Sequence, residues 1–189
     1  MRTLASVALV AALTLSAAFG QTVPRKAPDF TIAEPSGKQT ALSSARGKVC
    51  VLTFILTTCP HCQNESMMLT KLYKEMAPRG LAVFGVAVND NAAILVPQFV
   101  QQFAVGYPVG FGTQEAMRNF MGISEMERWV VPQVVVIDRK GMIRAQSPYN
   151  GDPNLQSETY MRNLLDTLLK EGATSSKTGA KSTASNHHQ

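Results

Sequence analysis

The feature that most constrains this sequence is an apolar run that leads into a helix with a Cys-x-x-Cys start. The run Val49–Leu56 is almost continuously hydrophobic and has the length of a strand. Such runs are typical of strands covered on both faces, as in parallel sheets. Pro60 then stands where proline is favoured in a first helical turn, and apolar residues recur at helical spacing from Met68 to Met76. A second apolar strand over Leu81–Val88 completes a β-α-β unit.

The rest of the chain continues this α/β pattern, with no internal repeat and no second domain. Thr113 is a good N-cap for the helix that follows it, and Gly122 is a good stop signal after that helix. The order of elements predicts a single layered α/β domain. The other predicted elements are helices over 92–104 and 114–121, a short strand over 107–111, a hairpin of strands over 133–137 and 142–145, and a last amphipathic helix around 161–168.

Composition excludes several classes of protein. With 45% hydrophobic and 16% charged residues, the chain is not mainly disordered. Three cysteines in 189 residues are too few for a small domain held together by disulfides. A formal net charge of +5, scattered along the chain, argues against a nucleic-acid partner.

The first twenty residues have the pattern of a signal peptide. Arg2 supplies a positive start, Leu4–Phe19 is uncharged and apolar, and Ala18-Phe19-Gly20 places small residues before a cut at Gln21. The apolar stretch is short for a membrane span, so membrane attachment is expected only if the segment is uncleaved. We therefore expect a periplasmic or secreted protein, in a compartment where dithiols can be oxidised.

The remaining boundaries follow from composition. Residues 21–171 carry all the predicted elements and form the expected folded domain. Residues 172–189 are rich in Ser, Thr, Ala, Gly and Lys without an apolar period, which predicts a disordered tail. His187 and His188 are adjacent in that tail, where we expect no metal binding.

The chemistry of the chain centres on Cys59-Pro60-His61-Cys62. Two residues between the cysteines, within one helical turn, bring both sulfur atoms within bonding reach. Cys59 falls at the helix N-terminus, where unpaired N–H groups favour a thiolate, and His61 would add positive charge if protonated. Cys62 is expected to point inward and act as the resolving thiol. The motif predicts a redox-active Cys59–Cys62 disulfide that needs no separate cofactor.

Other interpretations of the cysteines and methionines are weaker. A zinc site usually needs two more ligands, and the one ordered candidate is His61 within the motif, so no metal site is expected. A purely structural disulfide remains an alternative. Cys50 lies in the first apolar strand and is expected to be a buried, inert thiol. Met117 and Met121 share a helix face, which favours core packing over copper binding.

Beyond the motif, the chain resembles the extracytoplasmic thioredoxin-fold proteins of the TlpA/ResA type, which overlap with the redoxin and AhpC/TSA group. The resemblance runs from about Ala27 to Lys170 and implies a thioredoxin fold with an N-terminal extension and a central strand-helix insertion. It rests on the order and spacing of Ala27-Pro28-Asp29-Phe30, Ser36-Gly37-Lys38, Gly47-Lys48-Val49, Val131-Pro132-Gln133 and Ile137-Asp138-Arg139-Lys140-Gly141.

The resemblance implies a role for each residue of the site. Cys59 would be the attacking thiolate, with Pro60 fixing the helix entry, and Cys62 would resolve the mixed disulfide. Pro132 would follow a cis peptide bond and face the disulfide, where the backbone of Val131 can pair with a substrate chain. Trp129 precedes this segment and either lines the substrate face or simply packs.

Three further positions near the motif can be compared with the family pattern. Glu65 resembles the glutamate thought to act on thiol protonation in ResA- and TlpA-type reductases, although an exposed helix carboxylate is an equal alternative. The tryptophan usual before the first cysteine is Thr58 here. The position that holds a buried acid in thioredoxin is Thr53, so we expect no carboxylate beneath the sheet there.

The implied activity is thiol-disulfide exchange with partner proteins, together with a membrane electron donor or acceptor. We expect reduction of protein disulfides, with apocytochrome c as a substrate by family analogy. A DsbA-like oxidase or isomerase is the alternative, because Pro60-His61 resembles the oxidising proteins. A third hypothesis is a non-catalytic binding module on the same fold, whose activity would survive Cys59→Ser. A peroxidase is disfavoured, because Leu56 stands where its threonine belongs, and the Cys spacing does not suit a Sco-type copper carrier.

Overall fold

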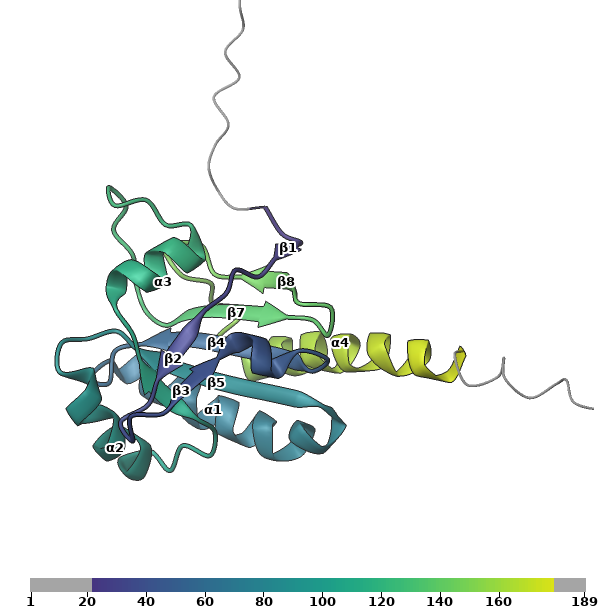
Figure 1. The fold of residues 1–189 in the computed structure, drawn as a ribbon, viewed down its shortest axis with the longest axis horizontal. Helices are drawn as coiled ribbons and strands as arrows, with labels where there is room; N and C mark the ends of the chain where they lie inside the picture. The colour runs from purple at the N-terminus through teal and green to yellow at the C-terminus, as the bar shows by residue number, and fades with distance from the viewer. Residues whose placement is uncertain (1–21, 179–189) are drawn as a thin grey trace, which may run out of the picture.

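A computed structural model describes residues 22–178, with side chains to residue 171. The expected signal peptide lies outside the described residues. All strands belong to one mixed sheet, in the order β1-β8-β7-β4-β5-β6-β2-β3 (Figure 1). The strands are β1 Arg25–Lys26, β2 Thr31–Ala33, β3 Gln39–Ala41, β4 Val49–Ile55, β5 Leu81–Ala87, β6 Val109–Phe111, β7 Gln133–Ile137 and β8 Met142–Gln146.

The centre of the sheet is formed by the two strands that were predicted from apolar runs. Every residue of β4 and of β5 is buried, and the two strands pair in parallel from Val49↔Leu81 to Ile55↔Ala87. On its other side β4 pairs antiparallel with β7. Full burial on both faces explains why these strands read as continuous apolar runs and not as alternating ones.

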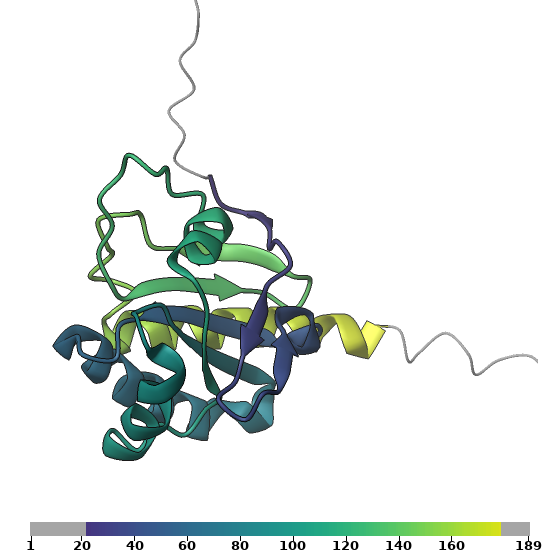
Figure 2. The ribbon, with the colours of Figure 1, turned by 60° about the vertical axis from the view of Figure 1, so that its left-hand side comes forward.

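The helices divide between the two faces of the sheet (Figures 1 and 2). Buried side chains of α1, α2 and α4, such as Leu69, Phe99 and Leu165, share one core cluster. Met117 and Phe120 of α3 belong to a second cluster on the opposite face. The helices are α1 Pro60–Met76, α2 Ala92–Gln102, α3 Gln114–Met121 and α4 Glu158–Thr178, with short 3-10 turns at Leu42–Ala45 and Ala77–Arg79.

The N-terminal extension reaches both edges of the sheet. Strand β1 pairs with β8 at one edge, while the β2–β3 hairpin pairs with β6 at the other. A side chain at Gly110 would place its Cβ atom 2.3 Å from the carbonyl oxygen of Ala33, so β2 can approach β6 only because residue 110 is glycine. The extension and the inserted β6–α3 segment agree with the expected thioredoxin-type architecture.

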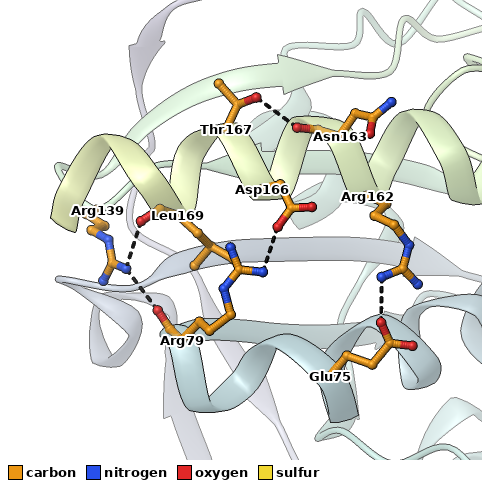
Figure 3. Close-up of polar contacts among 8 residues, drawn as sticks. All are labelled: Glu75, Arg79, Arg139, Arg162, Asn163, Asp166, Thr167 and Leu169. Atoms are coloured by element: carbon orange, nitrogen blue, oxygen red, sulfur yellow. Dashed lines mark hydrogen bonds and ion pairs between the residues drawn. The ribbon is translucent and has the colours of Figure 1, made fainter. Parts of the chain in front are cut away.

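Helix α4 is fixed to the end of α1 by polar contacts at the surface (Figure 3). Arg162 of α4 pairs with Glu75 near the end of α1. Arg79, in the turn after α1, pairs with Asp166 of α4 at 2.6 Å. The Arg139 guanidinium donates to the carbonyl oxygens of Arg79 and Leu169. These contacts hold α4 alongside α1, far along the helix from the two motif cysteines.

The C-terminal boundary differs from the expected one. A disordered tail was expected from residue 172, but α4 continues as helix to Thr178. Extending an existing helix needs no new nucleation, and the single Gly172 costs only about 1 kcal/mol relative to alanine. The rest of the expected tail lies outside the described residues. Within residues 22–178 we find no helix that meets the length and hydropathy needed to cross a membrane.

Candidate active site

The two motif cysteines lie at the start of α1 with very different exposure. Cys59 is the N-cap residue in extended conformation and is half-buried, and Pro60 is the first helical residue, as predicted. Cys62, in the same first turn, is fully buried, whereas His61 is exposed. Both cysteines are free thiols. The structure thus gives one accessible sulfur at the helix N-terminus and one inaccessible sulfur behind it.

The loop before Cys59 is held by hydrogen bonds to neighbouring elements. The backbone N–H of Thr57 donates to Asn89 Oδ1 at 3.0 Å, and Gln63 Nε2 donates to the Thr57 carbonyl oxygen at 3.1 Å. The N–H of Cys59 donates to the carbonyl oxygen of Leu56. The sequence analysis missed Asn89. Its signal was its place just after an apolar strand, at the carboxyl edge where parallel sheets position functional groups.

Glu65 is the third element of the site, and it is buried. Its side chain faces the sheet, where Thr53 Oγ1 donates to Glu65 Oε1 at 2.9 Å. Burial raises the pKa of the carboxyl from 4.5 to about 8, and the Thr53 hydrogen bond offsets only part of this effect. The exposed-carboxylate alternative is therefore wrong. Position 53 itself carries no carboxylate, as expected, but the helix places the Glu65 carboxyl beside it.

The environment of Cys62 disfavours its thiolate. Burial is the main cause that raises the pKa of Cys62 far above its ordinary value of 9.0, against a smaller lowering effect of the Leu56 backbone. The neighbouring Cys59 thiol and the Glu65 carboxylate raise it further. Cys62 therefore holds its proton unless a neighbouring group accepts it.

The segment before β7 lies at the same end of the sheet. The Val131–Pro132 peptide bond is cis, as the resemblance implies. Because β7 pairs antiparallel with β4 at Phe54↔Gln133, Pro132 lies one step further along, beside the end of β4 that leads to Cys59. Val131 packs against the same core cluster as Cys59.

The side chain of Gln133 holds the segment before β7 in place, and the sequence analysis missed this residue. The side chain is fully buried. Its Nε2 donates to the carbonyl oxygens of Val130, Pro148 and Tyr149 at 2.8, 3.2 and 3.2 Å. The available signal was an amide residue at the start of an otherwise apolar strand, since a buried amide needs partners.

Trp129 is half-buried and packs against the core cluster that contains α3. The Arg118 guanidinium lies 5.9 Å from its ring centroid. These contacts agree with the packing interpretation. A role for Trp129 in binding substrate stays a prediction.

The third cysteine and two of the methionines belong to the core. Cys50 is buried on β4, on the sheet face opposite to α1, and burial raises its pKa to about 12. This confirms the predicted buried thiol. Met117 and Met121 are buried in the same cluster, as expected for core packing. Among the residues described, no three His, Cys, Asp or Glu side chains gather as a metal site would require.

Comparison with known families identifies the group to which this site belongs. The model of the AhpC/TSA family matches residues 23–146, most of the folded domain. The chain belongs to the AhpC/TSA family. Its relatives include ResA and YneN proteins. Thiol-disulfide oxidoreductase ResA of Geobacillus thermodenitrificans (strain NG80-2) is 28% identical over 151 residues, which cover 76% of this chain and 83% of ResA. Thioredoxin-like protein YneN of Bacillus subtilis (strain 168) is 34% identical over 121 residues, covering 64% and 68% of the two chains.

Solved structures of thiol:disulfide interchange proteins have a similar fold. A thioredoxin-family thiol:disulfide interchange protein from Chlorobium tepidum TLS superposes with a TM-score of 0.65 at 26% identity, covering 78% of this chain and 98% of that one. A putative protein disulfide isomerase from Bacteroides thetaiotaomicron gives a TM-score of 0.66 at 26% identity, covering 82% and 94%. The chain is a thiol-disulfide oxidoreductase of the TlpA/ResA type on a thioredoxin fold.

Proposed function

We propose that this protein reduces disulfide bonds in other extracytoplasmic proteins through a Cys59–Cys62 dithiol. The observation that carries the proposal is the asymmetry at the start of α1. Cys59 is accessible at the helix N-terminus, whereas Cys62 is buried within reach of the Glu65 charge. Cys59 Sγ can therefore react with a protein substrate, whereas Cys62 Sγ can react only with Cys59.

The reaction proceeds in two exchange steps. The Cys59 thiolate attacks one sulfur of the substrate disulfide, a bond forms between them, and the other substrate sulfur leaves as a thiolate that takes up a proton. Cys62 then loses its proton and attacks Cys59 Sγ, which releases the second substrate thiol. Two electrons pass to the substrate, and the protein is left with a Cys59–Cys62 disulfide. An external dithiol donor must reduce it again.

Glu65 exchanges a proton with Cys62 in the second step. The pKa of Cys62 is raised by burial, so a proton acceptor is needed before it can attack. The Glu65 carboxyl, with a pKa of about 8, changes its charge near physiological pH and is shielded from bulk water. The expected consequence is a resolution step that accelerates as the pH rises through about 8.

The burial of Cys62 removes one possible source of a strongly oxidising disulfide. A stabilised thiolate would favour the reduced protein and make its disulfide a strong oxidant, but burial and the Glu65 charge disfavour a thiolate at Cys62. We place the protein in the periplasm or outside the cell. Its substrates are protein disulfides, including those of the C-x-x-C-H type found in apocytochrome c, and its electron donor is a membrane protein. The Pro60-His61 pair favours the second candidate, an oxidase of substrate dithiols.

The first experiment is to measure the reduction potential of the Cys59–Cys62 couple in the purified protein against defined thiol buffers. A reductant should have a value near or below about −270 mV, like thioredoxin. A value near about −180 mV or higher would instead indicate an oxidase or isomerase of substrate dithiols.

Insulin reduction by cysteine variants tests the roles of the two sulfurs. Cys59→Ser should lower the rate to that of the uncatalysed reaction. Cys62→Ser should also stop turnover but should accumulate a mixed disulfide through Cys59, visible by mass. Cys50→Ala is the matched control and should keep the wild-type rate, because Cys50 lies on the opposite face of the sheet. Turnover by Cys59→Ser would refute the mechanism. A disulfide-bonded C-x-x-C-H peptide used in place of insulin tests the narrower substrate class.

A further inference from the structure

A cluster of buried polar side chains lies beside Glu65, and the mechanism above does not use all of it. Tyr107, in the loop before β6, is only 4% exposed. Its hydroxyl, the Ser66 hydroxyl and the second carboxyl oxygen of Glu65 are all buried without a hydrogen-bond partner among the described residues. Two of these atoms belong to donors and one is an acceptor. Buried polar atoms of this kind are normally paired, so a cluster of them needs an explanation.

The sheet brings the Tyr107 hydroxyl toward Glu65. Thr53 of β4, which donates to Glu65, pairs in register with Gly85 of β5. A Cβ atom at Gly85 would lie 3.3 Å from Tyr107 Cε2, the ring carbon next to the one that carries the hydroxyl. The absence of a side chain at Gly85 therefore lets the polar end of the ring lie over β5, one strand from Thr53.

Helix α1 covers the same place from the other side. Ser66 and Glu65 follow Cys62 by four and three residues, so all three lie on one face of the helix, and all three are buried. Burial raises the pKa of Tyr107, and the charges of Glu65 and Cys62 raise it further. The Ser66 hydroxyl lies close enough to lower it, although the two hydroxyls do not meet hydrogen-bond geometry. Tyr107 therefore stays a neutral hydrogen-bond donor throughout the physiological range.

The charged groups of the other packed elements lie elsewhere. Helix α2, residues 92–102, contains no charged residue. Helix α4 directs Arg162 and Asp166 to Glu75 and Arg79, at the far end of α1. Among the described residues, burial and the Thr53 hydrogen bond set the pKa of Glu65, and the Glu65 charge in turn reaches Cys62 and Tyr107.

We propose that Tyr107, together with Ser66, is a positioning residue that donates to the free oxygen of Glu65 when this carboxyl loses its proton. The hydroxyls stabilise the charge that Glu65 carries while Cys62 is being deprotonated or reprotonated. The proposal rests on the proposed function, in which Glu65 exchanges a proton with Cys62. It adds that the pH range of the resolving step is set jointly by α1 and by the loop before β6.

The test is the titration of Glu65 in Tyr107→Phe, which removes one oxygen and keeps the ring. The side-chain carboxyl of Glu65 is followed by ¹³C NMR from pH 5 to 10 in the reduced protein. Loss of one hydrogen bond to a charged group should raise the midpoint by roughly one pH unit. Ser66→Ala should raise it in the same direction, and serves if Tyr107→Phe does not fold. Tyr73→Phe is the matched control, because its ring packs edge-on against Tyr107 at 6.4 Å and should leave the midpoint unchanged.

The outcomes separate this inference from the proposed function, because the titration needs no substrate. An unchanged or lowered Glu65 midpoint in a folded, active Tyr107→Phe protein would overturn the role of Tyr107 alone. If the Glu65 midpoint rises but the protein reduces no disulfide, the proposed hydrogen bond would be supported and the proposed reductase function would be refuted. In the active protein, the pH profile of insulin reduction should shift together with the Glu65 midpoint. In a Glu65→Gln background, adding Tyr107→Phe should not shift this pH profile further. A further shift in that background would also overturn the proposal.

Discussion

Helix α1 carries two glutamates, ten residues apart, whose surroundings are opposite. Glu65 is 3% exposed, has a neutral hydroxyl as its hydrogen-bond partner, and has a pKa raised by burial to about 8. Glu75 lies at the surface and pairs with Arg162 of α4 (Figure 3), and this pair lowers the pKa of Glu75. On the same helix, the surroundings of Glu65 disfavour the charged carboxylate, whereas those of Glu75 favour it.

The difference separates the two tasks of the helix. The first turns face the sheet and place a proton-exchanging group beside Cys62, at a cost in stability, because burial of a charge is unfavourable. In the last turn, the Glu75 side chain points to solvent and α4, where exposed ion pairs fix the position of a neighbouring helix and contribute little energy. Substitutions at the two sites should accordingly have opposite signs and different pH ranges.

The largest expected effect is that of Glu65→Gln on stability. The folded protein holds the Glu65 proton up to pH about 8, while the unfolded chain releases it near 4.5. The wild type therefore loses stability as the pH rises from about 4.5 to about 8. Glu65→Gln removes this loss, so its advantage should grow across that range to several kcal/mol, ~5 at most. Urea unfolding of the reduced proteins at pH 4 to 9 measures it.

Glu75→Gln is the matched control for this experiment, because it makes the same chemical change on the same helix. The folded-state pKa of Glu75 lies below its ordinary value, so its contribution is present above pH 4.5 and is lost in acid. Glu75→Gln should therefore be slightly less stable than the wild type at neutral pH. Parallel stability curves for the wild type and Glu65→Gln would show that Glu65 is not buried as described.

Thr53→Val tests the single hydrogen bond that Glu65 makes. Valine has nearly the shape of threonine and suits a buried strand, so the change removes little besides the donor. Both carboxyl oxygens would then be buried without a partner, which should cost about 1–3 kcal/mol of unfolding free energy and raise the Glu65 midpoint further. Carboxyl titration and urea unfolding at pH 6 measure the two effects. Thr167→Val, which removes an exposed donor on α4, should change neither. A lowered Glu65 midpoint in Thr53→Val would contradict the assigned bond.

The same helix shows which features the sequence reveals. Start and stop signals act within a few residues, so they can be recognised directly: Pro60 begins α1, Thr113 caps α3 through the Ala116 N–H, and Gly122 ends α3 with a φ of 67°. The central strands were equally visible, since burial on both faces leaves a continuous apolar run. The resemblance to a known family added the cis bond before Pro132.

The burial of Glu65 was not predicted, although part of its signal was present. The apolar positions Leu69, Leu72 and Met76 face the core, and the same periodicity carried back to the start of the helix includes Glu65 and Ser66. A polar residue on a core-facing stripe points to a buried functional group, because such a position is otherwise costly. The approach of Tyr107 over Gly85 and of β2 to Gly110 had no such signal, because these contacts join segments that only the sheet register brings together.

The smallest expected effect sharpens the contrast between the two glutamates by adding salt. An exposed ion pair is screened at 1 M salt, where the Debye length is about 3 Å, whereas a buried group is screened much less. The slight loss of stability in Glu75→Gln at pH 7 should therefore disappear in 1 M NaCl. The gain in Glu65→Gln should persist, since it arises from the burial of one carboxyl and not from a pair of charges. Urea unfolding of the three proteins at low and high salt measures both differences. A Glu65→Gln gain that vanished in salt would mean that surface charges, and not burial, govern this carboxyl, and the two ends of α1 would then no longer differ in kind.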